Sequence, residues 1–431
     1  MPSTHIKRLD IAGEASYMNR DADGEPSDSG LTWMACEFAD ASQVVAFGDT
    51  QTLEYNASTG GFGVNPGEAL IDPLTGVPVK RGSMTIDFYL RGGQTSHQTG
   101  LLLMLCSRLV GTGQTAKTTS GMSVNTTSVE VPTGVSGGQF LAWMMADNRI
   151  NYALSTNTST STSPNVTPAP NTAASFDTDV SSPAASGGSK ICSYKIPASG
   201  GDPIPYGTGT FALRLTGDGW QQLCFGCTMT ALSITADGDG RAIKLSATVD
   251  CPYIRDVRTN QATPVFPTVT AGPILHSLGA PARIQNKGNN TVLTGMGGGP
   301  CIAAWTMNFS WTTAGAACGS YWSGRAPLEA TSLDATLDLT IGTAPYDTID
   351  FFLAAWRSQA QLSVLLPFGG DLNSTNPRPF GGAIIIPAAI VADGSFLNPD
   401  LSGDAVQSTV SLKLSDLPSN SVLPLFCLGI I

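Results

Sequence analysis

This sequence has few charged side chains and very little histidine. Charged residues make up 13% of the 431 positions, and the only histidines are His5, His97 and His276. None of them lies in the H-E-x-x-H arrangement of a zinc hydrolase. A phosphate-binding G-x-x-x-x-G-K-[ST] loop is also missing. The sequence therefore predicts no enzyme, no catalytic residues and no cofactor.

Runs of basic residues and long apolar segments are missing too. Acidic residues outnumber basic ones by 33 to 22, which gives a net charge of −11. Such a chain repels nucleic-acid phosphates, so it suits a surface past which DNA slides; solubility is the simpler interpretation of the charge. No stretch approaches the roughly 20 apolar residues of a bilayer span, and the basic N-terminus lacks an apolar secretory segment. We expect no membrane span.

The nine cysteines are an odd number and are mostly scattered singly through apolar, strand-like stretches. This pattern is typical of free, buried cysteines and predicts assembly in a reducing cytoplasm. Cys224 and Cys227 form a single C-x-x-C pair without the second pair of ligands that a zinc site requires. Asp237-Gly238-Asp239-Gly240 is too short for a calcium-binding EF-hand loop and favours a hairpin turn. We therefore expect no metal site.

Glycine (48 residues) and proline (28 residues) are abundant, and 42% of the chain is hydrophobic. This composition favours a folded, mainly β protein of short strands and many turns. The Ser/Thr/Pro-rich tract 155–189 can bury little and is expected to be an exposed loop or a small decoration. The expected organisation is an N-terminal arm (1–30), a first unit (31–255) with an insertion at about 111–209, a linker (256–300) and a second unit (301–431).

A pattern near the start of the chain returns near its end. Polar and apolar residues alternate in Thr85–Leu90 and again in Thr336–Ile341, at an offset of 336 − 85 = 251. Each copy precedes a helix-like apolar run, the first over about 99–110, and then three strand-like segments. Duplication of a β-rich unit without a catalytic set suggests the building block of a symmetric assembly.

The alternation assigns Thr85, Asp87, Thr336 and Asp338 to the solvent-facing side of the repeated strands. Paired carboxylates can serve as general acid and base, but Asp87 and Asp338 belong to separate copies. Solvent-facing strand positions explain both aspartates more simply.

The linear arrangement of several stretches resembles that of a known family. The matching stretches are Ser83–Gly93, Leu101–Cys106, Leu223–Cys251, Ala303–Trp311, Gly324–Pro327 and Leu333–Ile341. In this order they are similar to the major tail tube proteins of long-tailed phages with flexible tails. The resemblance covers roughly residues 80–110 and 210–425; the Ser/Thr/Pro-rich tract and the acidic arm depart from it.

The resemblance implies a specific fold and assembly. Each unit would be a tail-tube-type β-sandwich with one flanking α-helix and long loops. Sheets of neighbouring units would pair laterally into a closed ring without free strand edges. Rings of this family are sixfold or pseudo-sixfold, so two units in one chain predict three chains per ring. Stacked rings would form a tube whose lumen conducts DNA into the host.

The resemblance also implies partners and a location. The partners would be further copies of the chain, the tail terminator, tape measure and distal tail proteins, and DNA that passes without specific binding. The protein would belong to the virion tail and be assembled in the host cytoplasm. Thr85, Asp87, Thr336 and Asp338 would then be candidates for lumen-facing positions.

Two other functions are compatible with the composition. A viral capsid or decoration protein with β-sandwich domains would also lack catalytic residues. A secreted carbohydrate-binding or adhesin module would need an export signal and clustered exposed aromatic residues. The seven tryptophans of this chain are dispersed, which makes the secreted module the weaker alternative.

Overall fold

The chain folds as a mainly β protein, as its composition predicts. The computed structural model describes residues 6, 8–22, 24–36, 38, 80–92, 100–115, 119–120, 128, 135–144, 150–168, 179–180, 190–196, 209–217, 219–237, 242–257, 274–277, 282–294, 301–315, 326–342, 346–369, 381–398, 407–415 and 423–430. The helical elements are α1 (Gly100–Leu105), α2 (Tyr346–Ser358) and two short 3-10 turns, η1 (Tyr17–Asn19) and η2 (Ser395–Leu397). The strands are β1 (Arg8–Gly13), β2 (Met34–Cys36), β3 (Lys80–Tyr89), β4 (Val110–Thr115), β5 (Thr119–Ser120), β6 (Phe140–Met144), β7 (Ile150–Ser155), β8 (Val166–Thr167), β9 (Asp179–Val180), β10 (Lys190–Ile196), β11 (Phe211–Gly217), β12 (Trp220–Asp237), β13 (Lys244–Val257), β14 (Arg283–Asn286), β15 (Val292–Thr294), β16 (Cys301–Ala314), β17 (Glu329–Gly342), β18 (Leu362–Gly369), β19 (Gly381–Val391), β20 (Gln407–Leu414) and β21 (Phe426–Ile430).

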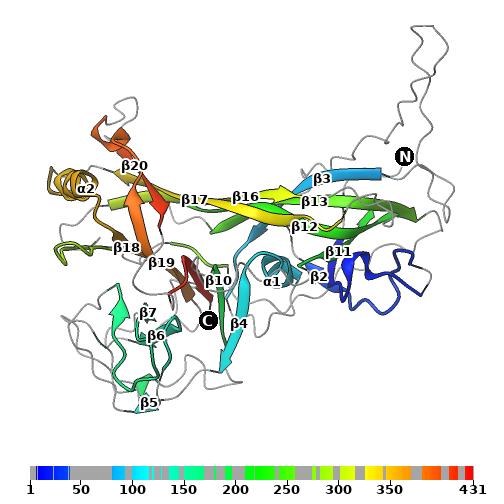
Figure 1. Ribbon diagram of the computed structural model, residues 1–431, viewed down its shortest axis with the longest axis horizontal. Coiled ribbons are helices and arrows are strands. Elements are labelled where there is room, and N and C mark those ends of the chain that lie inside the picture. Colours follow the sequence, from blue (N-terminus) through cyan, green and yellow to red (C-terminus); the bar gives the residue numbers. More distant parts are fainter. Residues whose placement is uncertain are drawn as a thin grey trace, which may run out of the picture.

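Six antiparallel strands form a continuous layer in the order β3-β13-β12-β16-β17-β20. We call this layer the platform. Figure 1 shows β3, β13, β12, β16 and β17 running along the upper part of the molecule, above α1 and β10. The platform joins the two halves of the chain, because β12 pairs with β16 over Ala231–Asp237. Alternation of buried and accessible residues gives it one apolar and one polar face.

The predicted duplication is present in the sheet topology. In the first half the strand order is β3-β13-β12-β11, and in the second it is β17-β20-β19-β18. A helix follows the first strand of each set, α1 after β3 and α2 after β17. A short pair also flanks each set, β1–β2 beside β11 and β14–β15 beside β18. The two halves therefore share one path of the chain through the sheet.

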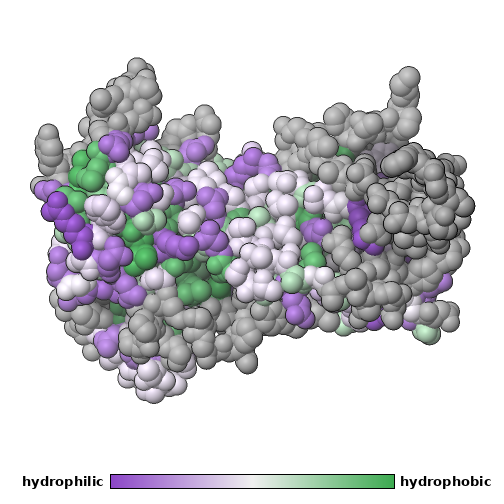
Figure 2. Space-filling model, turned by 45° about the horizontal axis from the view of Figure 1, so that its top comes forward, coloured by the Kyte–Doolittle hydropathy of each residue, from purple (hydrophilic) through white to green (hydrophobic). Residues whose placement is uncertain are grey.

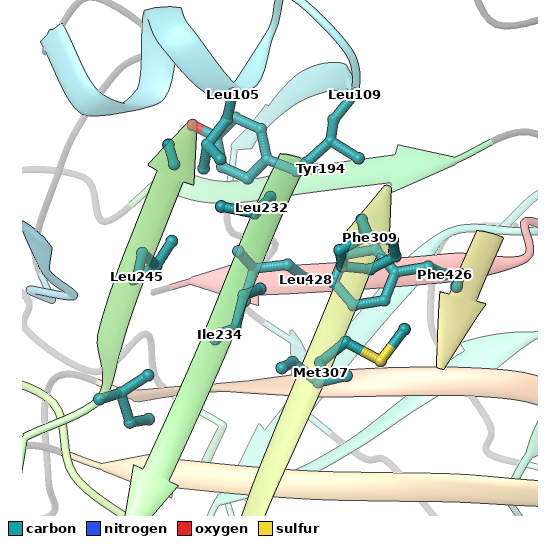
Figure 3. Packing of buried hydrophobic residues seen from close by; sticks show 14 of the residues in the cluster. Leu105, Leu109, Tyr194, Leu232, Ile234, Leu245, Met307, Phe309, Phe426 and Leu428 are labelled. Atoms are coloured by element: carbon teal, nitrogen blue, oxygen red, sulfur yellow. The ribbon is translucent and has the colours of Figure 1, made fainter. Parts of the chain in front are cut away.

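One hydrophobic core lies beneath the whole platform. Leu232, Ile234, Met307 and Phe309 from the two central strands belong to the same buried cluster. Beneath the platform lies a second layer that includes α1, β10 and β21 (Figure 1). Figure 3 shows the four side chains facing those of this layer, among them Leu105, Leu109, Tyr194, Phe426 and Leu428. The rings of Phe309 and Phe426 meet edge to face with centroids 4.8 Å apart, a favoured aromatic geometry. The two halves thus do not have separate cores.

The first helix is shorter than the sequence pattern indicates. The prediction of a helix over about 99–110 is wrong at its end, because α1 stops at Leu105 and β4 begins at Val110. Backbone hydrogen bonds from Ser107 to Met104 and from Arg108 to Leu105 tighten the chain into a turn. This turn directs the buried Arg108 side chain to the carbonyl oxygen of Met229, at 2.7 Å. The second helix, α2, begins at Tyr346.

Strands also form within the stretches expected to be an arm and a linker. In the expected arm, β1 pairs with β11 and β2. Its Asp10 is only 1% exposed and pairs with Arg8 and Arg214, at 2.9 and 3.0 Å. The polar, acidic composition of the expected arm therefore gave no indication that it contains a buried strand. In the expected linker, β14 pairs with β15 and β18, and so extends the sheet of the second half.

The insertion in the first half packs on the second half. Its small sheet, β6-β7-β8, contributes Phe140, Tyr152 and Leu154 to a cluster with Leu365 and Ile385. Within the Ser/Thr/Pro-rich tract, Thr167 is buried, and its hydroxyl lies 2.8 Å from that of Ser363. The return strand β10 pairs with the C-terminal strand β21. The described part of the insertion is therefore a packed decoration.

Candidate functional surface

The polar face of the platform carries all four of the solvent-facing positions predicted from the sequence. Thr85 is exposed, and Asp87, Thr336 and Asp338 are half-buried. The strand registers arrange the polar residues in rows that cross all six strands. One row reads Asp87, Ser246, Ser233, Asn308, Thr336 and Lys413; the next reads Tyr89, Lys244, Thr235, Thr306, Asp338 and Ser411. The structure thus brings the predicted residues onto one surface without placing them in contact.

Each of the two aspartates accepts a hydrogen bond from a serine on the neighbouring strand. The hydroxyl of Ser246, directly opposite on β13, donates to the carboxylate of Asp87 at 2.7 Å. The hydroxyl of Ser411, directly opposite on β20, donates to that of Asp338 at 2.5 Å. The repeat therefore relates a pair of residues on adjacent strands, with an offset of 338 − 87 = 251 for the aspartates and of 411 − 246 = 165 for the serines. A charge-assisted bond of this kind orients the carboxylate along the sheet surface.

Hydroxyl groups dominate this surface, and its charges are largely paired. The ammonium group of Lys244 lies 2.6 Å from the carboxylate of Asp87, and that of Lys413 lies 3.1 Å from Asp334. Asp338 has its serine partner but no lysine among the ion pairs of the described residues. Charge of both signs on neighbouring strands produces only a weak net field above the sheet.

A shallow hollow of about 290 Å³ lies at the centre of the polar face, where the two halves join. Its lining includes the hydroxyls of Ser233, Ser246, Thr248 and Thr336, and the carboxylate of Asp334. Figure 2, which brings this side of the molecule forward, shows mainly white and purple atoms across its middle. The surface at this hollow is therefore of mixed polarity. It offers no apolar cavity with a few convergent polar groups, the usual form of a small-molecule site.

The cysteines form no reactive centre in the described part of the chain. The thiols of Cys36, Cys224, Cys227, Cys251 and Cys427 are in no disulfide and are buried, as predicted, and that of Cys106 is half-buried. The Sγ atoms of Cys227 and Cys251 are 3.6 Å apart. Burial raises the pKa of Cys227 well above its usual value, and hydrogen bonding with Cys224 raises that of Cys251. Thiols that keep their proton are poor nucleophiles and poor metal ligands.

The described ranges contain no group of three His, Cys, Asp or Glu side chains suited to a metal ion. None of their helices is long and apolar enough to cross a membrane.

The serines and asparagine of the polar rows were not among the predicted site residues. Alternation in β13 and β16 marks Ser246 and Asn308 as solvent-facing. The sequence could not supply the register that sets Ser233 opposite Asn308. The side chains of these two residues form a hydrogen bond of 2.9 Å between the two halves. Comparison with protein-family models and with curated proteins found no match. The function is therefore inferred from the residues and their geometry.

Proposed function

We propose that this chain is the structural protein of a phage tail tube, as its resemblance to major tail tube proteins implies. Copies of the chain form rings, with three chains and six units in each, and the rings stack into a hollow tube. The observation that carries the proposal is the platform, one sheet that crosses both units and is polar on a single face. A tube wall needs this arrangement, with an apolar side facing the protein and a wettable side facing the lumen.

The duplicated topology supports pseudo-sixfold rings. Both units have the same strand order. In each unit the aspartate, Asp87 or Asp338, is hydrogen-bonded to a serine on the neighbouring strand. Two such units side by side in a chain resemble two adjacent positions of one ring. Since the units are fused, three chains supply the six positions.

The hydroxyl-rich face fits the passage of DNA. Basic clusters would hold phosphates through the release of counterions, whereas Lys244 and Lys413 are already paired with Asp87 and Asp334. Serine, threonine and asparagine keep the wall hydrated without strong attraction or repulsion. The acidity of the chain contributes less to this than the pairing of its charges. We accordingly place Thr85, Asp87, Thr336 and Asp338 on the lumen side, with DNA passing without specific binding.

The remaining expectations extend this proposal. The protein would reside in the virion tail after assembly in the host cytoplasm. Its partners would be other copies of itself, together with the terminator, tape measure and distal tail proteins. The chain would perform no enzymatic reaction.

Electron microscopy of the concentrated, purified protein tests the proposal. Stacked rings with pseudo-sixfold symmetry are expected. Closed shells or isolated trimers would favour the capsid or decoration alternative, and a monomer at every concentration would refute ring formation.

A charge reversal tests the placement of the polar face. Tubes of the Asp87→Arg/Asp338→Arg variant should retain short DNA in their lumen at low salt, because the lumen gains positive charge. The Asp28→Arg/Asp350→Arg variant makes the same change in charge at two exposed positions away from the platform. Equal retention of DNA inside tubes of both variants would contradict the assignment.

A further inference from the structure

The platform ends differently on its two sides. At one side, β3 pairs with β13 as its single strand neighbour among the described residues. At the other side, β20 pairs with β17 along its length, but with β19 only over Lys413, Leu414 and Leu412. The turn η2 lies beside the remainder of β20, where the hydroxyl of Ser395 donates to the carbonyl oxygen of Thr409 at 3.4 Å.

Comparison of the two units shows that η2 takes the place of the continuation of β12. In the first unit Leu232 of β12 lies opposite Ala247, and in the second Val391 of β19 lies opposite Leu412. Ala247 and Leu412 are themselves opposite equivalent positions of the repeated strands, so Val391 corresponds to Leu232. The correspondence continues for one more residue, because Ala392 donates its backbone N–H to Ser411. Beyond that residue the two units diverge.

In the first unit, β12 continues to Asp237 and pairs with β16, which joins the units. In the second unit, the chain turns into η2 after Val391, and Phe396 is buried there. The ring of Phe396 packs against those of Phe352 and Trp356 on α2, with centroid distances of 6.3 and 6.4 Å. To join a further unit in the same way, the second unit would have to extend β19 as a strand. Phe396 would then lose its contacts with α2.

Exposed apolar side chains occur at the same two ends. Among the described residues, the large hydrophobic side chains classed as exposed are Tyr89 (44%), Ile274 (37%) and Leu397 (43%). Tyr89 lies on β3, and Ile274 bridges to Arg91 just beyond that strand. Leu397 is the last residue of η2. A contact between these two ends would remove the apolar side chains of both from water.

We propose that the η2 end of one chain, through Leu397, docks on the β3 end of a second copy, through Tyr89 and Ile274. The contact is heterologous, since two different surfaces meet, and it closes into a ring when the rotation per chain is one third of a turn. This inference rests on the proposed tube function. It adds that two kinds of junction alternate around the ring: a strand-paired junction within each chain and a side-chain junction between chains.

Cysteine cross-linking of mixed chains tests the contact. One chain carries Leu397→Cys and the other Tyr89→Cys, and a short bifunctional maleimide is added at concentrations at which rings form. Cross-linked dimers are expected in the mixture, and a chain carrying both substitutions should give species of up to three chains. The wild-type protein and each single variant are the controls, because Cys106 is half-buried and could react. Dimers of the Leu397→Cys variant alone would indicate a like-with-like contact and overturn the proposal.

A second variant separates this inference from the tube function. Leu397→Asp should raise the concentration needed for ring formation by at least tenfold, whereas Asn398→Asp, at the exposed neighbour, should change it less than twofold. Rings that form normally in Leu397→Asp, or rings without any mixed cross-link, would refute this interface and leave the tube function standing. Absence of rings from the wild-type protein at every concentration would refute both.

Discussion

Glu14 provides the sharpest quantitative test of the structure, because a buried carboxyl group holds the N-terminal segment on the sheet. It follows β1 and is 6% exposed. One carboxyl oxygen accepts the backbone N–H of Gly226 on β12, at 2.9 Å, and the other accepts that of Met18 in η1, at 3.2 Å. Burial raises the pKa of Glu14 from 4.5 to about 7, although the bond from Gly226 partly offsets this rise.

This shift fixes the sign and size of a pH effect. A carboxyl group with a raised pKa binds its proton more tightly in the folded chain than in the unfolded chain. The stabilisation is therefore complete below pH 4.5, the ordinary value, and is lost as the pH rises through about 7. Each pKa unit corresponds to about 1.4 kcal/mol, so the free energy of unfolding should fall by roughly 3 kcal/mol across this window.

The Glu14→Gln variant removes the titration and keeps one oxygen for the N–H of Gly226. Loss of the second acceptor should lower stability by about 1 kcal/mol below pH 4.5, whereas above pH 7 the variant should be the more stable chain by roughly 2 kcal/mol, because it has no charge to bury. The diagnostic quantity is therefore the difference in slope between the variant and the wild type. Urea unfolding from pH 4.5 to pH 8 measures it, with Glu329→Gln as a matched control for the loss of one carboxylate. Parallel profiles for wild type and Glu14→Gln would refute the assigned pKa and its cause.

Two further predictions concern the contacts between the insertion, the C-terminal strand and the core. Phe426→Ala should lower the free energy of unfolding by about 3–5 kcal/mol, because a fully buried ring leaves a cavity, and Phe426→Leu should cost much less. Thermal unfolding of the two variants checks this; equal melting temperatures would contradict it. Gly429→Ala would place a methyl group against the ring of Phe140, so about 1–3 kcal/mol should be lost. An unchanged urea midpoint for this variant would mean that the insertion does not pack on β21 as described.

The fold class and much of the platform could be predicted from the sequence. Alternation located β3, β13, β16 and β17, because in each strand one face meets the core and the other meets water. Alternation fails where both faces are covered. In β19 all but one residue is buried, between the main core on one side and the insertion on the other. The sequence of such a strand is a continuous run of apolar residues without alternation.

Two other features depend on contacts between distant residues. Asp10 lies in the stretch expected to be an arm, and its partners Arg8 and Arg214 make its burial tolerable. The short β14 and β15 have no pattern of their own; β14 is held by pairing with β18, and β15 by pairing with β14. In the candidate surface, single strands revealed Asp87 and Asp338, but the serines opposite them required the register.

The register between β12 and β16 determines whether the two units can share one polar face. Ile234 lies opposite Met307, and both are fully buried, while Ser233 lies opposite Asn308 on the other side. A slip of one residue would set buried against solvent-facing positions along the junction and turn Met307 toward water. The apolar side chains beneath the junction therefore hold the polar rows in line above it. A continuous wall across two fused units is thus a consequence of their common core, and any substitution that shifts this register should disrupt the surface and the core together.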